Sequence, residues 1–234
     1  DGRRIGQRAM VIPAGGEASV LFEHRFDLPG DHVVEVRAEG DALPLDNRRY
    51  LALPVRRSMR VLCIEGRPSG RPFGGASDYL AVALAPGDDP NLSPSVEVDV
   101  VPENAVMEYD LSPYDCVAMC NVAQFTSGEA DVLSAYLRAG GSLVFFLGDQ
   151  VMPDRYNREI GSEAKAASRL LPAELGAVVE TREGRLDPLE YRHPILHAFR
   201  GTENAGLLTT PVDKHVRLAV LPDSRARVVL RLPG

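Results

Sequence analysis

The sequence predicts an α/β domain with a mostly parallel sheet and flanking helices, preceded by a smaller portion made of β-strands alone. Continuous apolar runs at 61–64, 116–119 and 143–147 have the length of strands that are buried on both faces of a sheet. A stretch with helical spacing of apolar residues separates the last two runs, which indicates a strand, helix, strand unit with a right-handed crossover. Short alternating runs before residue 57 predict the all-β portion.

Residues 1–57 contain four runs that are rich in β-branched residues and separated by turn signals, namely AMVIP, EASVLFEHRF, HVVEVRAEG and RRYLALPV. In the third run Val34 and Val36 alternate with the charged Glu35 and Arg37, as in a strand with one buried face. Four such strands predict a small sandwich or its last half. The stretch from Phe26 to Val55 resembles the end of bacterial immunoglobulin-like modules, which implies a sandwich of that type. We expect two domains, 1–57 and 58–234.

The second domain begins with a strand over 60–66 and a glycine-rich loop over 66–75. The loop lacks both common phosphate-binding patterns, and its prolines remove amides that a phosphate needs. Ser77 or Asp78 begins a helix. Apolar and acidic residues then alternate over 96–100, which predicts a strand toward the edge of the sheet.

The central unit spans residues 110–150. Thr126 and Glu129 form a capping box at the start of its helix, and Gly140-Gly141 ends that helix. Ligands in parallel sheets bind at the carboxyl ends of the strands, so we expect any chemistry at 121–123 and 148–150. Beyond this unit the sequence predicts a helix around 161–170, a helical turn near 195–199, and strands in four segments: AVVETRE, AGLLTTPV, VRLAVLP and ARVVLRL.

Composition narrows the class of protein. An apolar content of 44% with 25% charged residues is ordinary for a globular soluble domain. The net charge of −7 disfavours a nucleic-acid partner, which requires a basic face. The three cysteines do not suggest a disulfide framework. No membrane-length apolar run or signal peptide is present, and because the sequence starts at Asp1 without a methionine we infer a fragment of a longer protein.

Candidate site residues are few, and we predict no cofactor and no metal. Glu65 and Asp149 lie at strand ends, where a carboxylate can act as a base or can cap a loop. His193 and His197 have a zinc-like spacing, but Pro194 follows the first and no acidic residue lies between them. His193 is instead expected to cap the turn that begins at Pro194. Of the cysteines, Cys120 is the one nearest a strand end and the only one worth testing.

The order RVLCIEG, SDYLAVAL, YDCVAMCNV, EADVLSAYLRAGGSLVFFLGD and YRHPILHAF resembles class I glutamine amidotransferase-like domains, closest to the trehalose-utilisation-type branch, over roughly residues 60–200. The resemblance implies a flavodoxin-like sheet, and the segment 193–195 matches that branch's His-Pro-Ile. In true amidotransferases a cysteine nucleophile lies in a tight elbow after the central helix and strand, with a His-x-Glu pair downstream. Here the elbow, 146–150, reads FLGDQ and no His-x-Glu occurs. Glutaminase activity is therefore not implied.

An immunoglobulin-like module followed by such a degenerate domain also resembles the extracytoplasmic portion of large bacterial membrane proteins that carry a von Willebrand factor A domain, as in aerotolerance-type operons. This resemblance implies a non-catalytic interaction or scaffold segment of a membrane-anchored envelope protein, with domains of the same or a neighbouring envelope protein as partners. One alternative is a hydrolase or carbohydrate-active enzyme that uses Glu65, Asp149 and His193 around the strand-end crevice. Another is a small-ligand sensor at the same crevice.

Overall fold

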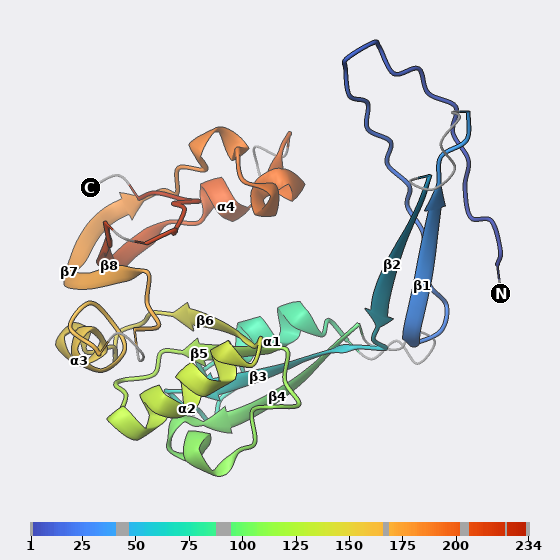
Figure 1. The fold of residues 1–234 in the computed structure, drawn as a ribbon. Coiled ribbons are helices and arrows are strands. Elements are labelled where there is room, and N and C mark those ends of the chain that lie inside the picture. Colours follow the sequence, from blue (N-terminus) through green and yellow to red (C-terminus); the bar gives the residue numbers. More distant parts are fainter. Residues whose placement is uncertain are drawn as a thin grey trace. The chain divides into compact units, whose positions relative to one another are not determined.

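The computed structural model describes residues 2–40, 47–87, 95–165, 169–201, 206–222 and 224–232 (Figure 1). The chain divides into two compact units, Asp1–Arg57 and Ser58–Gly234, here called the N-terminal unit and the C-terminal unit. The C-terminal unit has the mixed α/β architecture that the sequence predicts, with a four-stranded parallel sheet and flanking helices. No helix in the described part of the chain combines the length and apolar composition needed to cross a bilayer.

The N-terminal unit contains one antiparallel ribbon, formed by β1 (Gly30–Arg37) and β2 (Arg48–Val55). The two strands expected earlier, within AMVIP and EASVLFEHRF, are wrong, because residues 2–29 contain neither helix nor strand. A strand requires a hydrogen-bonded neighbour, and alternation in a sequence does not supply one. Side chains there remain exposed, as Val11 is 91% and Leu21 71% accessible. The structure thus contains a two-stranded ribbon and does not confirm an immunoglobulin-like sandwich.

The C-terminal unit is built on a parallel sheet with the strand order β4-β3-β5-β6. Its strands are β3 (Met59–Glu65), β4 (Val96–Pro102), β5 (Cys116–Cys120) and β6 (Ser142–Phe146). The two inner strands, β3 and β5, have the continuous apolar sequences typical of strands with neighbours on both sides. The outer strands β4 and β6 alternate between covered and exposed positions. The prediction that the alternating strand lies at an edge is confirmed for β4.

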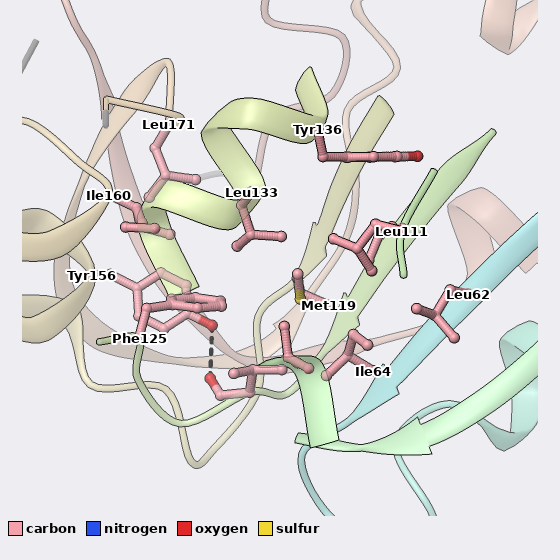
Figure 2. Close-up of a cluster of buried hydrophobic side chains, with 14 of the residues drawn as sticks. Leu62, Ile64, Leu111, Met119, Phe125, Leu133, Tyr136, Tyr156, Ile160 and Leu171 are labelled. Atoms are coloured by element: carbon pink, nitrogen blue, oxygen red, sulfur yellow. Dashed lines mark hydrogen bonds between the residues drawn. The ribbon is translucent and has the colours of Figure 1, made fainter. Parts of the chain in front are cut away.

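Helix α2 (Ser127–Arg138) packs on one face of this sheet and encloses the larger hydrophobic core. Figure 2 shows Leu133 and Tyr136 of α2 together with Leu62, Ile64 and Met119 from the sheet. The predicted capping box is present, since the Thr126 side chain accepts from the amide of Glu129 and the glutamate carboxylate accepts from the amide of Thr126. Gly140, with φ of +100°, ends the helix in the left-handed conformation that glycine adopts most easily.

The opposite face of the sheet is covered by the short helix α1 (Asp78–Leu84), whose Leu80 and Leu84 pack over a smaller cluster. All three cysteines project from this face, together with Val61 and Ala118. Because successive residues of a strand point to opposite faces, the two clusters follow directly from the alternating positions of β3 and β5. The helix begins after Ser77, as the sequence predicts.

Helix α3 (Pro153–Glu159) lies about one helix length before the helix that was expected around 161–170. That prediction is wrong for the described residues, because 160–165 form turns; residues 166–168 lie outside the described part. Proline is favoured in the first turn of a helix, where its missing amide costs nothing, and Pro153 occupies that position here. The buried Tyr156 of α3 donates a hydrogen bond of 2.6 Å to the carbonyl of Val122 (Figure 2).

The chain then forms an antiparallel pair, β7 (Ala173–Gly184) and β8 (Val212–Val220), with register shifts along it. Between these strands lie the short helical turns η3 (Leu189–Tyr191) and η4 (Pro194–Phe199), of which η4 confirms the turn predicted near 195–199. Two expected strands are wrong. Helix α4 (Gly206–Thr209) replaces the first, because its two leucines favour a helical turn. Residues 224–230 remain outside any ladder, and only Arg231 pairs, in an isolated bridge with Asp187.

Candidate functional site

The carboxyl ends of β3, β5 and β6 meet at one edge of the parallel sheet, here called the strand-end edge. It contains Glu65 at the end of β3, Asn121 after β5, and Asp149 three residues after β6. Three of the positions that the sequence indicated are therefore brought to a common edge. Their hydrogen bonds show what each side chain does there.

Glu65 is buried, with 5% of its surface exposed, and each of its oxygens accepts two hydrogen bonds. Oε1 accepts from the amides of Arg67 and Ala76, at 2.7 and 3.0 Å. Oε2 accepts from the amide and the hydroxyl of Ser77, at 2.7 and 2.6 Å. Burial raises the pKa of this carboxyl, but the hydrogen bonds from Ser77, Arg67 and Ala76 outweigh burial and hold the pKa below its ordinary value. Glu65 is an ionised group that organises the loop between β3 and α1.

This arrangement also decides what the loop can bind. In doubly wound α/β proteins, the backbone amides between the first strand and its helix commonly receive a phosphate. Here the amides of Ala76 and Ser77 already donate to Glu65. The carboxylate supplies the negative charge that a bound phosphate would otherwise bring.

Asn121 is the second organising residue of the edge. It has φ of +55°, a left-handed conformation that asparagine tolerates better than most residues. Its Nδ2 donates to Asp149 Oδ1 at 2.7 Å, and its Oδ1 accepts from the amide of Gln150 at 3.0 Å. A Cβ atom at Gly148 would overlap the side chain of Asn121, and one at Gly66 would overlap the Asn121 carbonyl. Asn121 thus fills the space beside Gly66 and Gly148.

Asp149 is the exposed acidic residue of the edge, with 69% of its side chain accessible. The hydrogen bond from Asn121, followed by the charge of Arg67, holds the pKa of Asp149 below its ordinary value. The contact with Arg67 is long, 3.4 Å from Nη1 to Oδ2, and both groups are largely in solvent. Such a pair contributes little to stability. Asp149 is ionised near neutral pH and is not set up to donate a proton.

No thiol or hydroxyl described at this edge is both activated and exposed. Cys63 and Cys120 are buried. The hydrogen bond between them lowers the pKa of Cys63 and, together with burial, raises the pKa of Cys120. Burial likewise raises the pKa of Cys116. The Ser77 hydroxyl is 1% exposed and donates to Glu65. Among the described residues, no hydrogen bond joins a histidine to Ser77 or to a cysteine. A nucleophile must also be accessible to a substrate, and both Ser77, whose hydroxyl donates to Glu65, and Cys63 are buried.

His193 is not part of the strand-end edge. Its Nδ1 accepts a hydrogen bond of 3.3 Å from the amide of Ile195, so it caps η4 as the sequence predicts. The residue lines a cavity of about 460 Å³ between segments 189–194 and 227–231, and neither Glu65 nor Asp149 lines that cavity. The described residues contain no group of three or more His, Cys, Asp or Glu side chains placed to hold a metal ion.

Two residues of the edge were missed by sequence reasoning. Arg67 lies beside Asp149, and Glu103 accepts a hydrogen bond of 3.1 Å from the amide of Ala123. Both lie close to the end of a strand: Arg67 is two residues after β3, and Glu103 follows β4 directly. The rule that placed Glu65 at the edge would have placed these residues there as well.

Comparisons with known proteins give no further assignment, because the sequence matches no family model, no curated protein and no solved structure.

Proposed function

We propose that the C-terminal unit is an amidotransferase-like domain without catalytic chemistry, and that the chain is a non-catalytic interaction or scaffold segment of a membrane-anchored bacterial envelope protein. The observation that supports this proposal most directly is that the polar groups of the strand-end edge form hydrogen bonds with one another. Glu65 accepts four hydrogen bonds from its own loop, and Asn121 links the end of β5 to Asp149 and Gln150. A site that turns over a substrate needs groups that are free to meet it.

The finer features of the fold belong to the same proposal. The strand order β4-β3-β5-β6, with helices on both faces, supports a flavodoxin-like core of the amidotransferase type. The β1-β2 hairpin is consistent with the last two strands of an immunoglobulin-like module. In such an arrangement the partners are other domains of the same or a neighbouring envelope protein, and a net charge of −7 disfavours nucleic acid.

The hydrolase alternative requires Glu65, Asp149 and His193 to act on one substrate. Glu65 is enclosed by its own loop, and His193 caps η4 beside a cavity that the other two residues do not line. General acid and base groups have to lie within hydrogen-bond reach of the same reacting atoms. The separation of these side chains supports the non-catalytic proposal over this alternative.

An activity assay tests the absence of catalysis. The purified chain is incubated with glutamine, with an aryl ester and with aryl glycosides, alongside Asp149→Asn, Cys120→Ala and the control Asp154→Asn, which removes an exposed carboxylate of α3. We expect product to form no faster than in buffer for every protein. Turnover by the unaltered chain that is lost in Asp149→Asn or Cys120→Ala, and kept in Asp154→Asn, would overturn the proposal.

Localisation requires a separate test. In spheroplasts of the source bacterium, the full-length protein should sediment with membranes, and added protease should remove an epitope placed in the C-terminal unit. An epitope that is protected until the membrane is lysed contradicts the extracytoplasmic placement, and recovery in the soluble fraction contradicts the membrane anchor.

A further inference from the structure

The cavity beside η4 has an unusual lining for so acidic a chain. It measures about 460 Å³, within the range of roughly 300–1,000 Å³ that small-molecule sites occupy. Its lining residues include Arg192, Arg227 and Arg231 together with His193, and Glu190 is the one acidic residue among those described. The chain as a whole carries a net charge of −7. Positive charge is therefore concentrated at a concave surface, where it attracts anions most strongly.

The two segments that form the cavity are held together at Asp187. Its backbone exchanges two hydrogen bonds with Arg231, at 2.7 and 3.0 Å, and its side chain accepts from the amide of Leu189 at 2.9 Å. Arg200 donates to the carbonyl of Tyr191 at 2.8 Å and supports the same turn from the other side. The cavity walls are thus fixed relative to each other by backbone contacts.

The turn η3 is conformationally strained. Leu189, Glu190 and Tyr191 have φ values of +48°, +59° and +54°. Residues other than glycine, asparagine and aspartate rarely adopt this left-handed backbone conformation. Three successive residues in this region persist only where the surrounding structure imposes them, and such strain is common at ligand-binding positions. Here the strained turn places Glu190 in the cavity lining, next to Arg192.

The three arginines of the cavity differ in whether their side chains already have a hydrogen-bond partner. Arg192 donates from Nε and Nη2 to Glu190 Oε2, at 3.1 and 2.6 Å, so one carboxylate already holds it. No hydrogen bond or ion pair joins the side chain of Arg227 or Arg231 to another residue that the structure describes. Both lie on the segment 227–231, which forms one wall of the cavity.

His193 adds a neutral donor to this set. Because its Nδ1 accepts from the amide of Ile195, the neutral ring carries its proton on Nε2. That nitrogen can donate to a bound oxygen without any change in the capping contact. The lining then offers guanidinium forks, which bind phosphate and carboxylate oxygens in pairs, together with one imidazole donor.

We propose that this cavity binds a small molecule with two anionic groups, phosphate or carboxylate, one group held by Arg227 or Arg231 and the other near Arg192 and His193. Glu190 takes the place of the second group when no ligand is bound. This binding site is separate from the strand-end edge and does not depend on the function proposed above.

Calorimetric titration of the complete chain at constant ionic strength tests the proposal. The probes are pyrophosphate and citrate, which carry several linked anionic groups, and inorganic phosphate, which carries one. We expect saturable binding of pyrophosphate or citrate that is tighter than that of phosphate, and the tighter of the two identifies the preferred chemistry. An Arg227→Gln/Arg231→Gln double variant should weaken it at least about tenfold, since hydrogen bonds to charged groups alter affinity by that factor or more.

Two further variants separate specific recognition from general attraction. The control Arg155→Gln/Arg158→Gln removes two positive charges from α3, outside the cavity lining, and should bind as the unaltered chain does. Glu190→Gln removes the competing carboxylate and should tighten binding several-fold. The absence of saturable binding, equal weakening in both double variants, or weaker binding by Glu190→Gln each overturns the proposal. Circular dichroism of every variant establishes that it is folded.

Discussion

The amide and the hydroxyl of Ser77 both donate to the carboxylate of Glu65, at 2.7 and 2.6 Å. Serine before a helix ordinarily uses its hydroxyl oxygen to accept from the helix amides, but the side chain of Ser77 makes no such contact with α1. The start of α1 is therefore fixed by a residue of β3. Because this buried carboxylate fixes the loop before α1, we expect it to contribute to the stability of the fold.

Replacing Glu65 with glutamine should lower the free energy of unfolding by about 2–3 kcal/mol. Hydrogen bonds to a charged group contribute roughly 1.5–3 kcal/mol, and the NH2 group of glutamine would face an N–H or O–H donor that now bonds to the carboxylate. Urea unfolding followed by circular dichroism measures the change. Glu163→Gln, at an exposed position, is the control and should change stability by less than about 0.5 kcal/mol. An equal effect of both substitutions contradicts the structural role of Glu65.

The same carboxylate predicts a dependence of stability on pH. Its pKa in the folded chain lies below the ordinary value of 4.5, so the unfolded chain binds the proton more readily. The contribution of Glu65 to stability is complete above the ordinary value and is lost as the pH falls through the lower folded value. Unfolding measured between pH 7 and 3 should show a smaller loss of stability in acid for Glu65→Gln than for the unaltered chain. Parallel curves for the two proteins contradict this assignment.

Introducing a cysteine at Gly148 should destabilise the chain. A Cβ at Gly148 would overlap the side chain of Asn121, so we expect Gly148→Cys to cost about 1–3 kcal/mol, as is usual for overpacking. The double variant Gly148→Cys/Asn121→Gly removes the overlap. A double-mutant cycle by urea unfolding should give a combined loss smaller than the sum of the two single losses. Strict additivity shows that the two residues do not compete for this space.

The side chain of Asn157 should be essential to the start of β7. Its Nδ2 donates to the carbonyl of Leu175 at 2.8 Å, and its Oδ1 accepts from the amide of Leu175 at 2.9 Å, both in a buried setting. Asn157→Leu leaves two buried backbone groups without partners, and we expect a loss of about 3 kcal/mol. Hydrogen exchange should show the Leu175 amide exchanging faster in this variant. Unchanged protection at Leu175 would mean that the contact is dispensable.

Tyr156→Phe provides a smaller and more local perturbation. It removes the hydrogen bond of 2.6 Å to the Val122 carbonyl but keeps the ring, whose edge-to-face contact with Phe125 has a centroid distance of 5.0 Å. We expect a loss of about 1–2 kcal/mol, the cost of one unpaired buried carbonyl. Tyr79→Phe, at an exposed ring of α1, serves as the control. Thermal unfolding measures the midpoint temperature of each variant. An equal decrease in this temperature for both variants would contradict the prediction.

Local signals in the sequence predicted the elements that depend on local chemistry. The capping box at Thr126 and the paired glycines at 140–141 fixed the ends of α2, and continuous apolar runs identified β3, β5 and β6. The strands expected before residue 27 failed, because alternation indicates how a strand would be buried and not which strand pairs with it. The helix expected around 161–170 is wrong, because the helix in this region begins earlier, at Pro153, and ends at Glu159.

The sequence predicted where the candidate site lies in the fold but not what its residues do there. Strand ends identified Glu65 and Asp149, but the role of Glu65 is set by the amides of Arg67 and Ala76, which reach it through the conformation of a loop. No periodic pattern encodes such a loop. His193 lines a cavity that neither acidic residue lines, and nothing in the sequence gives the distance between them.

The position of β3 inside the sheet has a consequence for how the chain folds. β3 is the first strand of the sheet along the chain, and the residues that contact it come much later in the sequence. The side chain of Arg60 contacts Asp99, 39 residues further along the chain, and the amide of Arg60 donates to Asp115, 55 residues further along. Contacts that are distant in sequence slow folding, because long loops must close before they are stabilised. During synthesis, Leu62 and Ile64 therefore stay uncovered until α2 and β5 have left the ribosome, and that interval is when the nascent chain is most open to aggregation or to capture by a chaperone.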